Sequence, residues 1–176
     1  MIRGILKTFA VWLHILAYIL HSLLGVFIVV RDRRLRFRAR TTSLHCRWAL
    51  PHMGFRVHLK GLEHFPADRK VLLVCNHMSY LDILVIGSAL PALFITSVEV
   101  RNTFFLGFMS RLAGSLFVER RKKSRLLQEI ADIGDTIGRG HTVVLFPEAT
   151  SSNGEALLPF KVALFEIPLR SDDPRE

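Results

Sequence analysis

The sequence is poor in cysteine: its 176 residues include only Cys46 and Cys75. This pair provides neither a zinc ligand set nor a disulfide framework, and it fits a reducing compartment. The sequence also lacks a G-x-S-x-G motif and a cysteine–histidine nucleophile pattern, so neither familiar kind of nucleophile for covalent catalysis is predicted. It contains no internal repeat and no low-complexity tract. The length accommodates one catalytic domain and a membrane anchor, but not two catalytic domains.

Acidic residues are scarce in the first 40 positions, which hold one Asp against eight Lys or Arg. Residues 41–176 are nearly balanced, with sixteen basic and fourteen acidic side chains. A nucleic-acid-binding domain would carry its basic excess on the folded part. Here the excess flanks an apolar segment, so it favours anionic lipid head groups as partners and argues against nucleic acid.

Charged residues are missing altogether from 9–30, a run of 22 residues. As a helix with a rise of ~1.5 Å per residue, this run is about 33 Å long, enough for a bilayer core. No small-residue cleavage site follows, and six arginines lie within 31–40, which indicates a cytoplasmic flank and not a signal peptide. The run predicts a helix that either crosses the membrane or lies in its interface. In both cases we expect a membrane-bound protein with its catalytic domain on the cytoplasmic face.

Strand and helix patterns alternate after a short amphipathic connector. The expected strands are 55–60, 70–76, 92–97, 115–120 and 142–148, and the expected helices are 81–90, 103–113 and 122–139. This alternation predicts an α/β fold, with a mixed, mostly parallel sheet flanked by helices. We therefore divide the chain into a membrane anchor with a basic flank (1–40), a connector (41–54) and a catalytic domain (55–176).

Polar residues follow three of the expected strands, which is where ligands bind in open α/β sheets. After the first of them, His77 precedes Asp82, which stands at the start of a helix. The carboxylate could fix the imidazole tautomer and leave the other ring nitrogen as a general base. Alternatively, Asp82 only caps the helix and His77 fills a turn. The pair alone leaves both interpretations open.

The other two stretches also have two interpretations each. Residues 114–120, GSLFVER, bring Arg120 to the end of a strand, where its guanidinium could bind a phosphate or simply face solvent. Residues 146–154, FPEATSSNG, offer an acid, hydroxyls, an amide and a glycine. These groups could hold a polar head group, or they could form an ordinary turn after the strand.

Together the three stretches resemble the glycerolipid acyltransferase family, which includes the 1-acylglycerol-3-phosphate acyltransferases. Four family motifs are matched in order: N-H-x4-D by Asn76, His77 and Asp82, G-x-x-F-x-x-R by Gly114, Phe117 and Arg120, F-P-E-G-T by Phe146, Pro147, Glu148 and Thr150, and F-K by Phe160 and Lys161. The resemblance covers roughly residues 55 to 165.

The resemblance implies a mechanism without an acyl-enzyme. His77 would be the general base on the acceptor hydroxyl, Asp82 would orient it, and Arg120 would anchor a phosphate. Substrate-binding roles are implied for a further set of residues: Asn76, Gly114, Phe117, Glu148, Thr150 and Ser151. The donor would be acyl-CoA or acyl carrier protein, which is a co-substrate, so no cofactor and no metal are expected. The first acceptor implied is a lysophospholipid, 1-acylglycerol-3-phosphate, which would give phosphatidate.

Two positions depart from the family pattern and leave the acceptor open. Ala149 replaces a glycine, and Ser151 stands where phosphatidate-forming members commonly have a phosphate-binding arginine. An acyltransferase for another lysolipid, of the lyso-ornithine lipid or lysophosphatidylcholine type, is therefore the alternative.

The chain also stops before the family's fourth motif, so we expect a fragment or a shortened member that gains stability and activity from the next strand. One rival interpretation is a non-catalytic, membrane-bound lipid-binding protein. Another is a zinc site built from His52, His58 and His64, which are six residues apart. An intervening strand and a glycine make convergence of these three side chains improbable.

Overall fold

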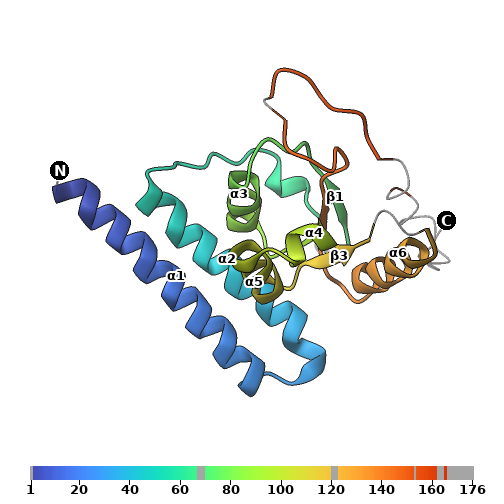
Figure 1. Ribbon diagram of the computed structural model, residues 1–176, viewed down its shortest axis with the longest axis horizontal. Coiled ribbons are helices and arrows are strands. Elements are labelled where there is room, and N and C mark those ends of the chain that lie inside the picture. Colours follow the sequence, from blue (N-terminus) through green and yellow to red (C-terminus); the bar gives the residue numbers. More distant parts are fainter. Residues whose placement is uncertain (1, 67–69, 120–122, 153, 162–164, 166–176) are drawn as a thin grey trace.

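The computed structural model describes residues 2–66, 70–119, 123–152, 154–161 and 165. It begins with two antiparallel helices, α1 (Ile2–Ile28) and α2 (Arg34–Met53), joined by the short 3-10 helix η1 (Arg31–Arg33) (Figure 1). Gly54 ends α2 in the left-handed conformation, with φ of 90°. The basic flank and the amphipathic connector expected from the sequence thus form one continuous helix.

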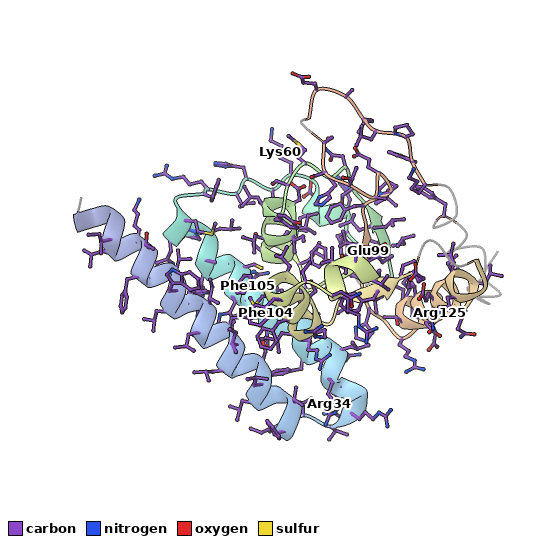
Figure 2. The ribbon with its side chains drawn as sticks, viewed as in Figure 1. Arg34, Lys60, Glu99, Phe104, Phe105 and Arg125 are labelled. Carbon is purple, nitrogen blue, oxygen red and sulfur yellow. The ribbon has the colours of Figure 1, made fainter. Side chains whose placement is uncertain are left out.

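Helix α1 is apolar on its outer side and polar where it meets α2. Phe9, Trp12 and Phe27 are exposed on α1, and Figure 2 shows side chains projecting from this helix away from the remainder of the molecule. Towards α2, the Tyr18 hydroxyl lies 3.0 Å from Thr42 Oγ1. Among described helices, only Gly4–Ile28 is long and apolar enough to cross a membrane.

The described sheet has four short strands in the order β1-β4-β2-β3, and every pairing is parallel. Its strands are β1 (Leu72–Val74), β2 (Leu93–Ser97), β3 (Leu116–Val118) and β4 (Val143–Leu145). The predicted α/β class is confirmed. Strand β4, last in the sequence, lies between β1 and β2, and its residues are fully buried.

Helices cover both faces of the sheet. They are α3 (Leu81–Ala89), α4 (Val98–Arg101), α5 (Phe104–Ala113) and α6 (Lys123–Gly138). Because successive strand residues point to opposite faces, Val143 and Leu145 pack with Ile130 of α6, whereas Val144 packs in the cluster that Ile86 of α3 joins. Each such fully buried aliphatic side chain contributes about 1.5–3 kcal/mol. The sheet is therefore fixed from both sides.

The predicted strand at 55–60 does not form, and this segment is extended and unpaired with the described strands. Its alternating pattern does not correspond to a buried face, because Phe55 and Leu59 both remain exposed. The segment runs between Gly54 and Gly61, both at positive φ. Sequence alternation alone was a misleading signal here, because a strand also needs a neighbouring edge with which to pair.

Helix α2 connects helix α1 to the domain that contains the sheet. Arg47 Nε–H donates to the carbonyl of Ser88 at the end of α3 (2.7 Å). Gly87 lies against Cys46, whose Sγ would be 3.2 Å from a Cβ added there. On its other side, a Cβ at Gly25 of α1 would overlap the Phe37 ring. Helix α2 is thus packed between α1 and the domain that carries the strand-end motifs.

Candidate active site

The register of the two neighbouring strands β1 and β4 brings two of the predicted motifs together. Val74 is paired with Leu145, and each strand continues past this pair at the same edge of the sheet. Three residues further on, His77 and Glu148 meet: the His77 main-chain N–H donates to Glu148 Oε1 (3.1 Å). This edge is formed by the carboxyl ends of the parallel strands, as expected for a ligand site.

His77 and Asp82 form a direct pair. The His77 Nδ1–H donates to Asp82 Oδ2 at 3.0 Å, and the two side chains are only 16% and 25% exposed. The same oxygen accepts the main-chain N–H groups of Met78 (2.7 Å) and Ser79 (2.9 Å). Asp82 therefore fulfils both roles considered from the sequence, since it organises the turn before α3 and also contacts the imidazole.

The surroundings of Asp82 keep it ionised. Burial by itself would raise the pKa of this carboxyl. The N–H groups of Ser79 and Met78 and the His77 ring outweigh burial, and they lower the pKa below its ordinary value. An anionic acceptor at Nδ1 keeps the proton on that nitrogen, so Nε2 of His77 has its lone pair free to act as a base.

Phe146 begins the F-P-E-A-T motif, but the sequence alone assigned it no role. Its ring stacks on the His77 imidazole, with centroids 4.2 Å apart and an interplanar angle of 21°. On the core side, Phe94 stacks on Phe146 at 6.3 Å. The available signal was an aromatic residue directly after a buried strand. Its contact with the histidine depends on β4 lying beside β1.

The main chain of His77 is held on both sides. Its N–H donates to Glu148, and its carbonyl accepts the N–H of Ser152 (2.8 Å). Glu148 is 2% exposed, and its second oxygen accepts the N–H of Leu158 (3.1 Å). Sequence reasoning gave no separate role to Ser152 or Leu158. Leu158 acts through its main-chain N–H, which leaves no signal in residue type, whereas the Ser152 hydroxyl also donates to the His77 carbonyl (3.4 Å).

The remaining predicted site residues fall into three groups. Asn76, Thr150 and Ser151 are exposed and adjoin the His77 and Glu148 loops along the chain. Gly114 ends α5 with φ of 79°, at the amino end of β3, so it lies at the opposite edge of the sheet from His77. Phe117 lies within β3, where Arg101 is 5.5 Å from its ring centroid. Arg120 lies outside the described residues.

Ala149 has a backbone conformation that explains the glycine usual at this position. Its φ is 63°, and it is the sole described residue other than glycine with positive φ. Its N–H donates to the carbonyl of Phe146 (3.1 Å), closing the turn that follows β4. An L-residue pays a steric penalty in this region, which glycine avoids. The turn is nevertheless made, and it directs Thr150 and Ser151 outwards.

Metal binding finds no support among the described residues, where no group of three or more His, Cys, Asp or Glu side chains could hold an ion. Of the three histidines considered for zinc, His52 lies in α2 with Nδ1 2.6 Å from the Trp48 carbonyl. His64 lies beyond the extended segment in the short helix η2 (Leu62–His64), beside Glu63.

Two hollows of about 390 and 610 Å³ occur elsewhere on the described part of the chain. The first is apolar and is bounded by the 59–66 segment and the C-terminal half of α3, and the second lies beside the end of α2. His77 lines neither hollow. His77 and Glu148 thus lie at the carboxyl edge of the sheet, and His77 lies outside both hollows. A base with a free ring nitrogen, placed there beside exposed hydroxyls and an amide, is suited to deprotonating an alcohol.

Comparison with known proteins yields relatives that match about two thirds of this chain. The lyso-ornithine lipid O-acyltransferase of Rhizobium meliloti is 39% identical over 113 residues, covering 64% of this chain and 38% of that protein. The 1-acyl-sn-glycerol-3-phosphate acyltransferase of Neisseria gonorrhoeae is 38% identical over 114 residues, covering 65% of this chain and 44% of that protein. The chain therefore spans less than half the length of these two relatives.

A solved structure shares the fold. The 1-acyl-sn-glycerophosphate acyltransferase PlsC from Thermotoga maritima superposes with a TM-score of 0.71, covering 97% of this chain and 70% of that one at 23% identity. The model of the family described as Acyltransferase matches residues 56–174. That match includes more than half of the sequence and all the strand-end motifs, and it confirms the resemblance they suggested: the chain belongs to the Acyltransferase family.

Proposed function

We propose that this protein transfers a fatty acyl group from a thioester to the free hydroxyl of a lysolipid. The observation that carries the proposal is the His77–Asp82 pair, with 3.0 Å between Nδ1 and Oδ2, at the carboxyl edge of the sheet. Family membership supports the reaction class. A general base of this kind typically contributes ~100- to 10,000-fold to the rate.

The proposed chemistry needs only one base. The Nε2 atom of His77 takes the proton of the acceptor hydroxyl while the hydroxyl oxygen forms a bond to the thioester carbonyl carbon. The carbon–sulfur bond then breaks, and the thiolate leaves with the proton that the imidazolium returns. Asp82 stabilises the transient imidazolium through Nδ1. The products are an acylated lipid and a free thiol of coenzyme A or acyl carrier protein, and the scheme includes no cofactor or metal.

The first acceptor we propose is 1-acylglycerol-3-phosphate, the substrate class in the name of the Neisseria gonorrhoeae relative. Asn76, Thr150 and Ser151 would contact its glycerol or head group. The sequence places four cations, from Arg120 to Lys123, after β3 and Glu119, and Arg120 would bind the phosphate. In this proposal Gly114 and Phe117 support the β3 segment. The lipid acceptor reaches the site from the membrane, at its cytoplasmic face.

Lyso-ornithine lipid is the second candidate acceptor. Ser151 occupies the position at which phosphatidate-forming members commonly carry an arginine, which removes one phosphate-binding cation. The Rhizobium meliloti relative is named for this acceptor. Because a hydroxyl binds a phosphate much less strongly than a guanidinium, Ser151 favours a head group that is not a phosphate monoester.

The test is an acceptor panel in which lysophosphatidate, glycerol 3-phosphate, lysophosphatidylcholine and lyso-ornithine lipid are offered to wild type and His77→Ala. The radiolabelled acyl donor is acyl-CoA in one series and acylated acyl carrier protein in the other. We expect transfer to one lysolipid by wild type and a loss of at least 100-fold in the variant. The exposed His64 provides the matched control, and His64→Ala should retain full activity. Substantial transfer by folded His77→Ala would remove the mechanism. No transfer to any acceptor, with either donor type, would favour the non-catalytic lipid-binding alternative.

A further inference from the structure

Glu148 is the most deeply buried carboxylate near the candidate site. Its residue is 2% exposed, Oε1 accepts the His77 N–H and Oε2 accepts the Leu158 N–H, each at 3.1 Å. Removing a carboxylate from water costs several kcal/mol unless hydrogen bonds compensate it. Both oxygens are compensated by main-chain donors of this chain. That leaves little of the side chain for a lipid head group.

The chemistry of the two donors accounts for glutamate at this position. A carboxylate accepts at both oxygens, whereas the amide of glutamine accepts at one end and donates at the other. Glutamine at 148 would turn an N–H group towards one of two main-chain N–H groups. The position thus requires an acceptor at each of the two terminal atoms of the side chain. This requirement comes from the main-chain donors of the protein and not from a substrate.

The carboxylate also connects three segments that are distant in the sequence. It lies on the loop after β4, binds the loop after β1 through His77, and binds the 154–161 segment through Leu158. A second bond supports the latter contact, since the Lys161 N–H donates to the Pro147 carbonyl (2.8 Å). Displacement of the 154–161 segment would therefore act directly on the main chain of His77.

We infer that Glu148 is a positioning residue: it fixes the His77 imidazole through the His77 main chain, and it does not bind the acceptor. The expected effect on kcat rests on the proposed acyl transfer. The expected effect on the position of the His77 imidazole does not. A misplacement of about 1 Å in a reacting group can cost 100-fold in rate. A head-group ligand would instead be required mainly for acceptor affinity.

The kinetic test compares Glu148→Gln with wild type under saturating acyl-CoA. We expect kcat to fall at least 10-fold while KM for the acceptor changes by less than about threefold. Glu63→Gln, the same substitution at an exposed position, should leave both parameters unchanged. If kcat were retained while KM for the acceptor rose at least 10-fold, the inference would be overturned, because that result would identify Glu148 as an acceptor ligand.

A spectroscopic test does not require turnover. In protein labelled with ¹⁵N-histidine, the His77 Nδ1–H proton bonded to Asp82 is assigned by its absence from His77→Ala. We expect exchange of this proton with water to be at least 10-fold faster in Glu148→Gln and unchanged in Glu63→Gln. Unchanged exchange in folded Glu148→Gln contradicts the inference. If wild type lacks acyl transfer, the proposed function fails while this measurement still decides the role of Glu148.

Leu158→Pro provides a second variant in case Glu148→Gln does not fold. The substitution removes the N–H donor to Oε2 and leaves the carboxylate in place. Pro159 follows, so residue 158 favours an extended backbone that proline tolerates. A positioning role predicts a several-fold lower kcat and faster Nδ1–H exchange, at constant KM. If Oε2 were an acceptor ligand, freeing it would leave kcat and the exchange rate unchanged, and that result overturns the inference.

Discussion

Ala149 has a left-handed backbone, with φ of 63°, in a turn that directs two candidate substrate contacts outwards. A side chain in this region costs about 1–2 kcal/mol, and glycine would recover this while losing about 0.4–1 kcal/mol to the entropy of the unfolded chain. We therefore expect Ala149→Gly to raise the free energy of unfolding by about 0.5–1 kcal/mol in denaturant titrations.

Ala131 offers a control with the opposite sign, because it is exposed within the regular helix α6. Ala131→Gly should lower the free energy of unfolding by about 1 kcal/mol. A destabilised Ala149→Gly variant would show that the turn does not hold the strained conformation in solution.

Phe146 stacks on the His77 imidazole at 4.2 Å, whereas Phe94 contacts Phe146 from the core side. Both are buried, so Phe→Leu at either position should cost about 1–2 kcal/mol of stability. Only Phe146→Leu removes the flat surface that stacks on the His77 ring. We expect it to lower kcat for acyl transfer about 10-fold, with Phe94→Leu within about threefold of wild type. Equal kcat values for the two variants would show that stacking does not orient the imidazole.

At the scale of elements, three histidines connect the N-terminal helices. His45 of α2 is buried, and its two ring nitrogens each lie 3.3 Å from a ring nitrogen of His14 or His21 on α1. Burial, reinforced by the charges that His14 and His21 can carry, lowers the pKa of His45 to about 4. The packing of α1 against α2 therefore depends on an uncharged His45.

The sign of the pH dependence follows from this lowered pKa. Unfolded His45 binds a proton below about pH 6.5, while folded His45 resists protonation until about pH 4. The unfolded state thus binds more protons in that window, so stability falls as pH falls from 6.5 towards 4 and levels off below. We expect unfolding in one detergent to require about 2 kcal/mol less at pH 5 than at pH 7.

His45→Asn should flatten this pH dependence, and His64→Asn, which alters an exposed histidine, should retain it. An equally steep pH dependence in His45→Asn would assign the effect to another group.

For the whole molecule, the packing of α1 on α2 constrains how the protein meets a membrane. The contacts extend from Gly25 beside Phe37 to His14, whose ring centroid is 6.1 Å from that of His52. Helix α2 carries five arginines: Arg34, Arg36, Arg38, Arg40 and Arg47. If α1 crossed the bilayer in this arrangement, some of these arginines would enter the hydrocarbon, at roughly 2.5–3.5 kcal/mol each. The geometry favours α1 lying in the interface, with its apolar side in the lipid.

This arrangement predicts that both ends of α1 face the same compartment. Gly4→Cys and Arg31→Cys, exposed positions near the two ends of α1, should each react with an impermeant maleimide from the same side of sealed vesicles, which we expect to be the cytoplasmic side. Burial raises the pKa of Cys46 to about 12 and also raises that of Cys75, so the native thiols should give a low background. Labelling of the two introduced cysteines from opposite sides would establish a spanning α1.

The sequence by itself determined the α/β class and the apolar helix, and it proposed the His77–Asp82 pair as one of two interpretations. Each of these depends on neighbouring residues: hydrophobic periodicity, charge distribution, or a histidine one turn before a helix-start aspartate. Only the tertiary structure decided that β4 lies beside β1, and hence that Phe146, Glu148 and Ser152 surround His77. It also decided that residues 55–60 stay unpaired. The basic flank and the connector, predicted as separate segments, form the single helix α2. Strand order and burial arise from long-range packing, to which every element contributes, and no local stretch of sequence contains that information.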